Sequence, residues 1–311
     1  MPSREQEQRR LASIEDRRGV ALDLVKLEEA LFAWRNSLAG LLPDLRARGF
    51  DLPDPLPADQ FLAAHLDPMP DPQLLRRAAE GLHQALERFP APQSAVLWWR
   101  RSADEEARER ALAAWFSASW RNDREGLARM AADAGIDTDV FAWCGRELCR
   151  PFFHRLGETL AASLRGTLPA RPTCPSCGGA PRLARLERDE RQRHLWCRLC
   201  GIEWPYRRLS CPFCGNAEHE KLGYLAIEGT DSQRVDVCEV CRSYIRTVDE
   251  RGLPEGGRVD FLAEDVATVH LCMAAEKRGY RPGGPGASGD VLTTPAPGGA
   301  DSRVPARRGN S

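Results

Sequence analysis

The sequence predicts an α+β fold in which a helical N-terminal region precedes two small β units and a C-terminal helix. Two observations lead to this prediction. Apolar residues recur at helical spacing between Leu24 and Leu164, whereas from Leu195 onward they alternate with a period of two in short runs. Eight cysteines form four Cys-x-x-Cys pairs between Cys174 and Cys241, which indicates compact units that gather several thiols.

The N-terminal region, residues 1–168, is predicted to be a helical domain. Leucine and tryptophan residues spaced three and four apart mark a first helix that Pro43 ends, and a second apolar series follows a loop rich in proline and aspartate. A helix around Trp115 and another that begins near Thr138 and bends near Pro151 complete the domain. Their apolar stripes are expected to form a hydrophobic core.

The cysteine pairs have the spacing of metal ligands. Two residues separate the thiols of each pair, so one tight turn can bring both sulfur atoms onto the same ion, at the metal–sulfur distance of about 2.3 Å found in tetrahedral zinc–thiolate sites. Glycine follows three of the pairs and supplies the positive φ that turns the chain back, whereas Arg242 follows the fourth and is expected to adopt either this left-handed conformation or a relaxed turn. The predicted metal ligands are Cys174, Cys177, Cys197, Cys200, Cys211, Cys214, Cys238 and Cys241.

Taken in chain order, the pairs predict two zinc-ribbon or rubredoxin-like units, residues 169–210 and 211–280, each holding one metal ion through four cysteines. Short strands around Leu195, Trp204 and Val235 would carry the pairs. An interleaved arrangement, with the first pair facing the third and the second facing the fourth, stays open, although the short link between the second and third pairs favours the sequential one. Such units have too little core to fold alone, so bound metal would stabilise them.

Other uses of the cysteines stay open. Structural disulfides need an oxidising compartment, of which the sequence gives no sign, and thiol exchange generally uses one active pair at the start of a helix. Cys144 and Cys149 are expected to be small buried side chains, because their spacing does not suit joint ligation. The role of Cys272 is not predicted. Four-thiolate sites accept zinc and iron alike, so the sequence does not determine the native metal.

Composition disfavours several functional classes. The net charge of −1 argues against general attraction to nucleic acid or to an anionic membrane. No apolar run approaches the roughly 18 residues needed to cross a bilayer, so we expect a cytoplasmic protein without membrane insertion. Residues 171–210 carry nine arginines against four acids, which predicts a mildly basic, solvated or protein-binding face rather than a nucleic-acid site. No Ser-His-Asp, P-loop or dinucleotide motif indicates a catalytic class.

Three further elements are predicted near the C-terminus. Residues 228–233 contain glycine and aspartate and are expected to form a hairpin turn. Asp260 is expected to cap a single helix that continues through Met273 and is closed by Gly279. Residues 281–311 are rich in glycine and proline and poor in apolar side chains, which predicts a disordered tail.

Five segments within residues 170 to 280 carry a specific resemblance to a known family. They read CPSCGGAP (174–181), HLWCRLCGIEW (194–204), CPFC (211–214), CEVCRSYI (238–245) and AEDVATVHL (263–271). In this order they resemble the formate dehydrogenase accessory (formation) protein family. The chain departs from the family pattern at Cys272, where an aspartate is expected, and in its glycine- and proline-rich tail.

This resemblance implies a non-catalytic, cytoplasmic accessory protein that binds the catalytic subunit of formate dehydrogenase and is needed for its assembly or activation. It also implies that all eight paired cysteines are ligands and that iron is the metal. Two alternatives stay open: a thiol or iron redox enzyme acting on the client's cofactor, and, less favoured, a nucleic-acid-binding zinc-ribbon protein. Self-association is a further open question.

Overall fold

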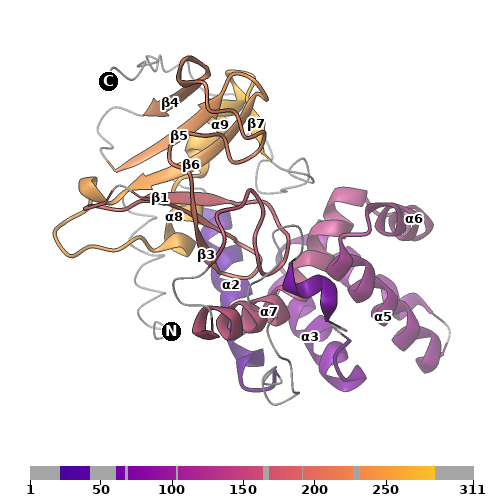
Figure 1. Cartoon of the computed structure of the whole chain (residues 1–311). Coiled ribbons are helices and arrows are strands. Elements are labelled where there is room, and N and C mark those ends of the chain that lie inside the picture. The colour runs from indigo at the N-terminus through magenta and orange to yellow at the C-terminus, as the bar shows by residue number, and fades with distance from the viewer. Residues whose placement is uncertain are drawn as a thin grey trace.

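The computed structural model describes residues 22–42, 61–66, 69–102, 104–163, 168–190, 192–226 and 232–283. Figure 1 shows a helical region beside a region built around a β-sheet, with α2 and α7 lying between them. The sheet region carries both groups of paired cysteines, and helices follow it in the chain. This order confirms the predicted α+β fold class.

Several helices of the N-terminal region begin or end at capping residues that the sequence supplies. Asp71, Asp104 and Asp123 accept hydrogen bonds from backbone N–H groups in the first turns of α3, α5 and α6. Asn122 and Gly135, which end α5 and α6, both adopt left-handed conformations. The described elements are α2 (Leu22–Ala39), η2 (Leu62–His65), α3 (Pro72–Ala85), α4 (Pro90–Val96), η3 (Trp98–Arg101), α5 (Glu105–Arg121), α6 (Arg124–Ala134) and α7 (Thr138–Ser163).

Helix α7 is the central element of this region. It contacts α2, α3, α4, α5 and α6, and it continues through Pro151. The ring of Phe153 on α7 stacks on Trp120 of α5 with 3.9 Å between centroids, and the Trp120 indole N–H donates to the carbonyl of Ala63 at 3.2 Å. Tryptophan rings thus fill much of the core volume in this half of the chain, and two of them, Trp34 and Trp120, also donate to backbone carbonyls.

One continuous sheet joins the two predicted β units. Its strands run in the order β3-β2-β1-β6-β5-β4, with β7 pairing β6 outside this path. Pairs β1–β2, β2–β3, β4–β5 and β5–β6 are antiparallel, whereas β1 and β6 run parallel and link the units. The strands are β1 (Leu183–Leu186), β2 (Arg193–Trp196), β3 (Glu203–Tyr206), β4 (Leu222–Ala226), β5 (Gln233–Cys238), β6 (Ser243–Asp249) and β7 (Arg281–Pro282).

The chain after the sheet differs from the prediction. Asp260 does cap a helix, α8 (Phe261–Ala267), but the single predicted helix is interrupted at Thr268, and α9 (Val269–Glu276) follows. The Thr268 hydroxyl bonds to the Glu264 carbonyl and accepts a hydrogen bond from Arg246, so polar contacts hold the break. Arg281 and Pro282, assigned to the disordered tail, form β7 against β6. The rest of the tail, from residue 284, and residues 228–231 of the predicted turn lie outside the described residues.

The main hydrophobic core crosses from the helices into the first cysteine unit. The buried side chains of α5 and α7 form one cluster with Leu195 and Trp204 of the sheet. Three paired cysteines of the first unit, Cys174, Cys197 and Cys200, belong to the same cluster. The second unit instead packs β5 and β6 against α9 in a separate small core. The first unit is therefore anchored to the helical region more extensively than the second.

Candidate metal centres

The structure gathers the paired cysteines into the two sequential groups. The first cysteine cluster contains Cys174, Cys177, Cys197 and Cys200, and the second cysteine cluster contains Cys211, Cys214, Cys238 and Cys241. Within each cluster the four sulfur atoms lie within 4.8 Å of one another. The interleaved alternative is therefore wrong.

The sulfur separations fit a tetrahedral metal site. Four sulfurs placed about 2.3 Å from one ion are about 3.8 Å from each other. The Cys174–Cys200 and Cys177–Cys197 sulfurs are 3.3 and 3.4 Å apart. In the second cluster, the Cys211–Cys241 separation is 3.6 Å and the Cys214–Cys238 separation is 3.7 Å. The donor set is also that of zinc and iron sites, so both clusters could hold a metal ion.

Three of the cysteine turns share the same backbone hydrogen bonds. In each, the N–H of the following glycine donates to the carbonyl of the first cysteine, at 2.8 to 3.0 Å. Gly178, Gly201 and Gly215 have φ of 72°, 74° and 75°, as their positions in the sequence predict. Arg242 follows the fourth pair and has φ of 55°, which confirms that a side chain occupies a left-handed position there.

Contacts around Arg242 offset the cost of that conformation. Its guanidinium pairs with Glu239, donates to the carbonyl of Arg278 at 2.8 Å and lies 4.1 Å from the centre of the Tyr280 ring. Tyr280 also donates a hydrogen bond to Glu239. Arg242 thereby ties the fourth cysteine turn to the end of the C-terminal helices, which a glycine could not do.

The first cysteine cluster is seated directly on the helical region. The N–H groups of Leu62 and Ala63 donate to the carbonyls of Pro175 and Ser176 at 3.2 and 2.9 Å. On α7, Gly157 lies so close to the second turn that a Cβ atom there would be 2.2 Å from the Cys200 carbonyl oxygen. Cys174, Cys197 and Cys200 are buried, and Cys177 is partly buried.

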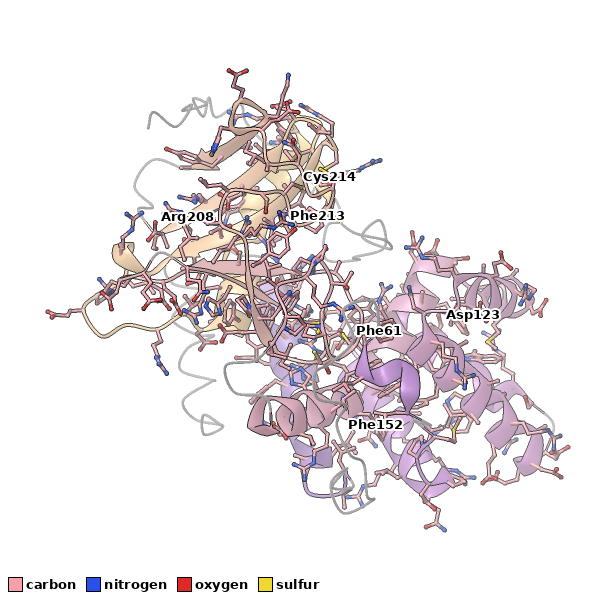
Figure 2. The ribbon with its side chains drawn as sticks, in the orientation of Figure 1. Phe61, Asp123, Phe152, Arg208, Phe213 and Cys214 are labelled. Carbon is pink, nitrogen blue, oxygen red and sulfur yellow. The ribbon has the colours of Figure 1, made fainter. Side chains whose placement is uncertain are left out.

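The second cysteine cluster is more open to solvent. Cys214 is exposed and Cys241 is half-buried, whereas Cys211 and Cys238 are buried. Figure 2 places Cys214 and Phe213 on the sheet region, with Cys214 away from the helices of the N-terminal region. Two large apolar side chains beside the cluster are also exposed, Leu209 at 57% and Val240 at 56%. The two clusters thus share a ligand set but differ in access.

A buried network of charges joins the first cluster to the rest of the molecule. Asp265 of α8 pairs with three arginines: Arg182, which follows the first cysteine turn, Arg198, which lies within the second, and Arg246 of β6. Arg198 also pairs with Glu28 of α2. Because α2, α8, β6 and a cysteine turn meet here, the network fixes how these elements are placed around the first cluster.

The charged state of the network follows from its arginines. Burial alone would raise the pKa of Asp265, but Arg182, Arg198 and Arg246 outweigh this effect and hold the pKa well below its usual value. Glu28 behaves in the same way, since Arg198 and neighbouring guanidinium groups lower its pKa despite complete burial. Both carboxyl groups are therefore ionised at neutral pH.

Several arginines of residues 171–210, predicted to form a solvated or protein-binding face, instead make internal ion pairs, whereas Arg207 and Arg208 are exposed. Arg193 is 3% exposed and pairs with Asp236, and Arg182 and Arg198 are directed into the network around Asp265. Arg185 pairs with Glu203 at 2.6 Å and with Glu250 at 3.4 Å. The positive charge counted in the sequence is used mainly for internal ion pairs, which weakens the case for a nucleic-acid surface.

The unpaired cysteines occupy core positions. Cys144 and Cys149 are fully buried, and their thiols face the carbonyls of Pro92 and Phe116, each at 3.5 Å, which confirms the prediction of small buried side chains. Burial raises the pKa of the Cys149 thiol well above its usual value. Cys272 belongs to the small core of the second unit.

Sequence reasoning missed the charged network. Glu28 and Asp265 belong to separate helices, and 170 residues separate Glu28 from its partner Arg198, so no local pattern connects them. The available signal was a set of charged residues at core-facing positions of helices that are otherwise apolar. Glu28, one turn from Leu24 and Leu31 on α2, is an example.

Comparisons with known proteins agree with these observations. No family model matches the chain. The FdhE homologue of Aquifex aeolicus is 36% identical over 110 residues, which cover 34% of this chain and 38% of that protein. The FdhE homologue of Pseudomonas aeruginosa is 31% identical over 120 residues, 36% of this chain and 37% of the homologue. The aligned segments thus span less than half of these relatives.

The fold is shared more widely than the sequence. The crystal structure of the FdhE protein from Pseudomonas aeruginosa matches 93% of this chain and 98% of its own, with a TM-score of 0.57 and 22% identity. Among the described residues, none of the helices has the length and apolar character needed to span a bilayer. The chain is thus similar in sequence to FdhE homologues over about a third of its length, it shares the fold of the Pseudomonas aeruginosa FdhE protein, and it carries two four-cysteine clusters.

Proposed function

We propose that this chain is a cytoplasmic, non-catalytic accessory protein that binds the catalytic subunit of formate dehydrogenase and promotes its assembly or activation. In this proposal, residues 1–168 form a helical domain, 169–210 and 211–280 form metal units, and all eight paired cysteines are ligands. The observation that carries it is the pair of four-cysteine clusters in a chain similar to FdhE homologues.

The metal ions have mainly a structural role in this proposal. Each would be held by four thiolates, so no ligand position is left open for a substrate. Zinc would be redox-silent, whereas iron held in the same way could exchange one electron. The sheet and its turns would then present a fixed surface to the client, with the exposed side chains of Leu209 and Val240 beside the second cluster as part of it.

The proposal is tested by capture of the client. The tagged chain, bound to its metal, is mixed with the isolated catalytic subunit of formate dehydrogenase, and association is measured by calorimetry or light scattering. We expect a defined complex that is weakened by Leu209→Asp and Val240→Asp but not by Arg129→Asp, an exposed change on α6. A failure of the native chain to associate with the subunit would contradict the proposal.

A second function is favoured by one observation, the exposure of Cys214. A thiol or iron redox enzyme acting on the client's cofactor would need such access, and the second cluster provides it while the first does not. Cys214→Ser separates the two functions. A redox enzyme loses client activation while folding and metal content survive, whereas an accessory protein loses activation only together with metal or with binding of the client.

A further inference from the structure

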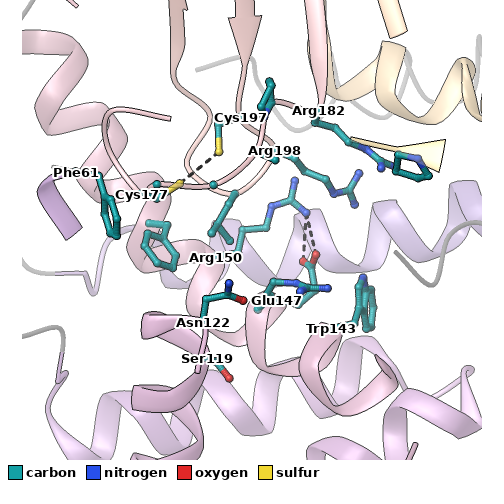
Figure 3. A pocket seen from close by; sticks show the side chains of 18 of the residues that line it. Phe61, Ser119, Asn122, Trp143, Glu147, Arg150, Cys177, Arg182, Cys197 and Arg198 are labelled. Carbon is teal, nitrogen blue, oxygen red and sulfur yellow. Dashed lines mark hydrogen bonds and ion pairs between the residues drawn. The ribbon is translucent and has the colours of Figure 1, made fainter. Parts of the chain in front are cut away.

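A cavity lies between the helical region and the first cysteine cluster, whose Cys177 and Cys197 form part of its wall. Its volume is about 320 Å³, within the range of pockets that bind small molecules. Figure 3 shows Arg150, Arg182 and Arg198 gathered at one side of it, near Glu147 and Trp143. The walls come from α5, α7, the cysteine turns and β6, so the cavity exists only where these elements meet.

Arg150 is the most informative residue of this cavity. Its side chain is 1% exposed, and its Nη1 atom contacts Glu147 at 3.2 and 3.3 Å. Its Nε and Nη2 atoms are also buried, and they have no hydrogen-bond partner within the described residues. Leaving donors of a buried guanidinium unpaired is costly, so the geometry calls for an acceptor inside the cavity.

The charges around the cavity specify the kind of acceptor. Six arginines line it, and Arg35 lies behind Glu147, at 3.6 Å. Among the described residues, the acidic side chains that pair with this group include Glu147, Glu28 and Asp265. Counted over these ten described residues alone, seven positive charges exceed three negative ones by four, and a divalent ion with four thiolates in the first cluster would reduce the difference to about two. A dianion matches this surplus better than a single carboxylate does.

We propose that this cavity binds a small organic phosphate. Guanidinium groups that converge from different elements suit the tetrahedral array of phosphate oxygens, and Arg150 would donate from Nε and Nη2. The cavity has room for more than a phosphate group, and Trp143 and Phe61 in its wall provide apolar surface for the organic part. Ligand binding here would also fill the junction between the helical region and the first cysteine cluster.

Calorimetric titration of the metal-loaded full chain tests the proposal with three probes. Phenyl phosphate, inorganic phosphate and benzoate separate the contributions of the phosphate group and of the ring. We expect saturable 1:1 binding in the order phenyl phosphate, phosphate, benzoate, from strongest to weakest. The assignment of an organic phosphate is overturned if benzoate or inorganic phosphate binds as tightly as phenyl phosphate. It is also overturned if no probe shows saturable binding.

Variants locate the site. Arg150→Gln is expected to weaken phenyl phosphate binding by about tenfold to a hundredfold, because two charge-assisted hydrogen bonds are lost. The double variant Arg121→Gln/Arg146→Gln changes one exposed and one half-buried residue at the cavity rim. We expect this double variant to weaken phenyl phosphate binding several-fold. It also tests the proposal if Arg150→Gln does not fold. Arg129→Gln, on the exposed surface of α6, is the matched control and should leave affinity unchanged. Equal losses in the rim variant and the control would overturn the proposed location.

Discussion

At the scale of single residues, the arrangement depends on charges that are buried but paired. Asp265 has a fully buried side chain and accepts from three guanidinium groups, and its backbone carbonyl accepts from Arg246 at 2.6 Å. A buried ion pair contributes little net stability compared with apolar side chains of the same volume, but removing one partner leaves the others uncompensated. Replacing Asp265 would therefore leave the charges of three guanidinium groups without their shared carboxylate partner.

We predict that Asp265→Asn lowers the free energy of unfolding by about 3 to 5 kcal/mol, the usual cost of removing one partner from a buried pair. Urea unfolding followed by circular dichroism measures this difference. Asp133→Asn, an exposed change on α6, is the control and should stay within about 0.5 kcal/mol of the native chain. A similarly small effect for Asp265→Asn would show that the network does not hold the elements together.

The same residue predicts a dependence on pH. The pKa of Asp265 in the folded chain lies below the value of about 4 expected when unfolded, so ionisation of this group favours folding. Its contribution is complete above about pH 4 and is lost as the pH falls from there toward the folded pKa. The stability difference between the native chain and Asp265→Asn should therefore be constant from pH 6 to 8 and shrink below pH 4. A difference that grows on acidification would contradict the sign of the shift.

At the scale of elements, the first cysteine cluster is held by a close approach between α7 and the turn at Cys200. Gly157 permits this approach because it has no side chain. Alanine favours a helix interior by about 1 kcal/mol over glycine, so Gly157→Ala would stabilise an isolated helix. Here the added methyl group meets backbone rather than a flexible side chain, and the steric conflict should dominate.

We predict that Gly157→Ala destabilises the chain by about 1 to 3 kcal/mol, the usual range for overpacking. Gly40→Ala is the matched control, because nothing lies within 4 Å of the added atom, and it should be neutral or slightly stabilising. Thermal unfolding of the two variants side by side gives the comparison. The prediction fails if both substitutions raise the melting temperature.

The two cysteine clusters should differ in how fast they lose metal. Cys214 is exposed in the second cluster, whereas the first is covered by α7 and η2. With excess chelator, we predict two phases of metal release of equal amplitude, the faster from the second cluster. Cys214→Ser should abolish the fast phase and leave the slow one, and Cys197→Ser should do the reverse. A single phase in the native chain, or loss of the slow phase in Cys214→Ser, would contradict the assignment.

Local patterns in the sequence predicted the longer helices α2, α3, α5 and α7 and the cysteine turns, and they favoured the sequential grouping of the thiols, whereas α4 and α6 were not predicted. Spacing and turn glycines predicted these features because each depends on residues close together in the chain. The parallel pairing of β1 with β6 could not be predicted in this way, since Leu183 and its partner Arg246 lie in different cysteine units. The interruption at Thr268 and the ion pairs of Asp265 likewise depend on Arg246, a contact that exists only in the folded chain.

At the scale of the whole molecule, the chain consists of a helical region and a sheet region that share one core. That core extends from α5 and α7 to the first cysteine cluster, and the sheet continues from there to the second. Metal in the first cluster would thus support the junction of the two regions, and metal in the second would support the outer part of the sheet. An accessory protein that presents both regions to a client would depend on both ions.

Metal analysis of the chain purified without oxygen tests this account most directly. We predict two equivalents of metal per chain, with one equivalent lost when Cys197 or Cys238 is replaced by serine and both lost in the double variant. A visible spectrum of the same samples identifies the ion, because ferric thiolate sites are coloured and zinc sites are not. A native chain that is folded, has all its thiols reduced and holds one equivalent of metal or less would contradict the central claim that each cluster binds one ion.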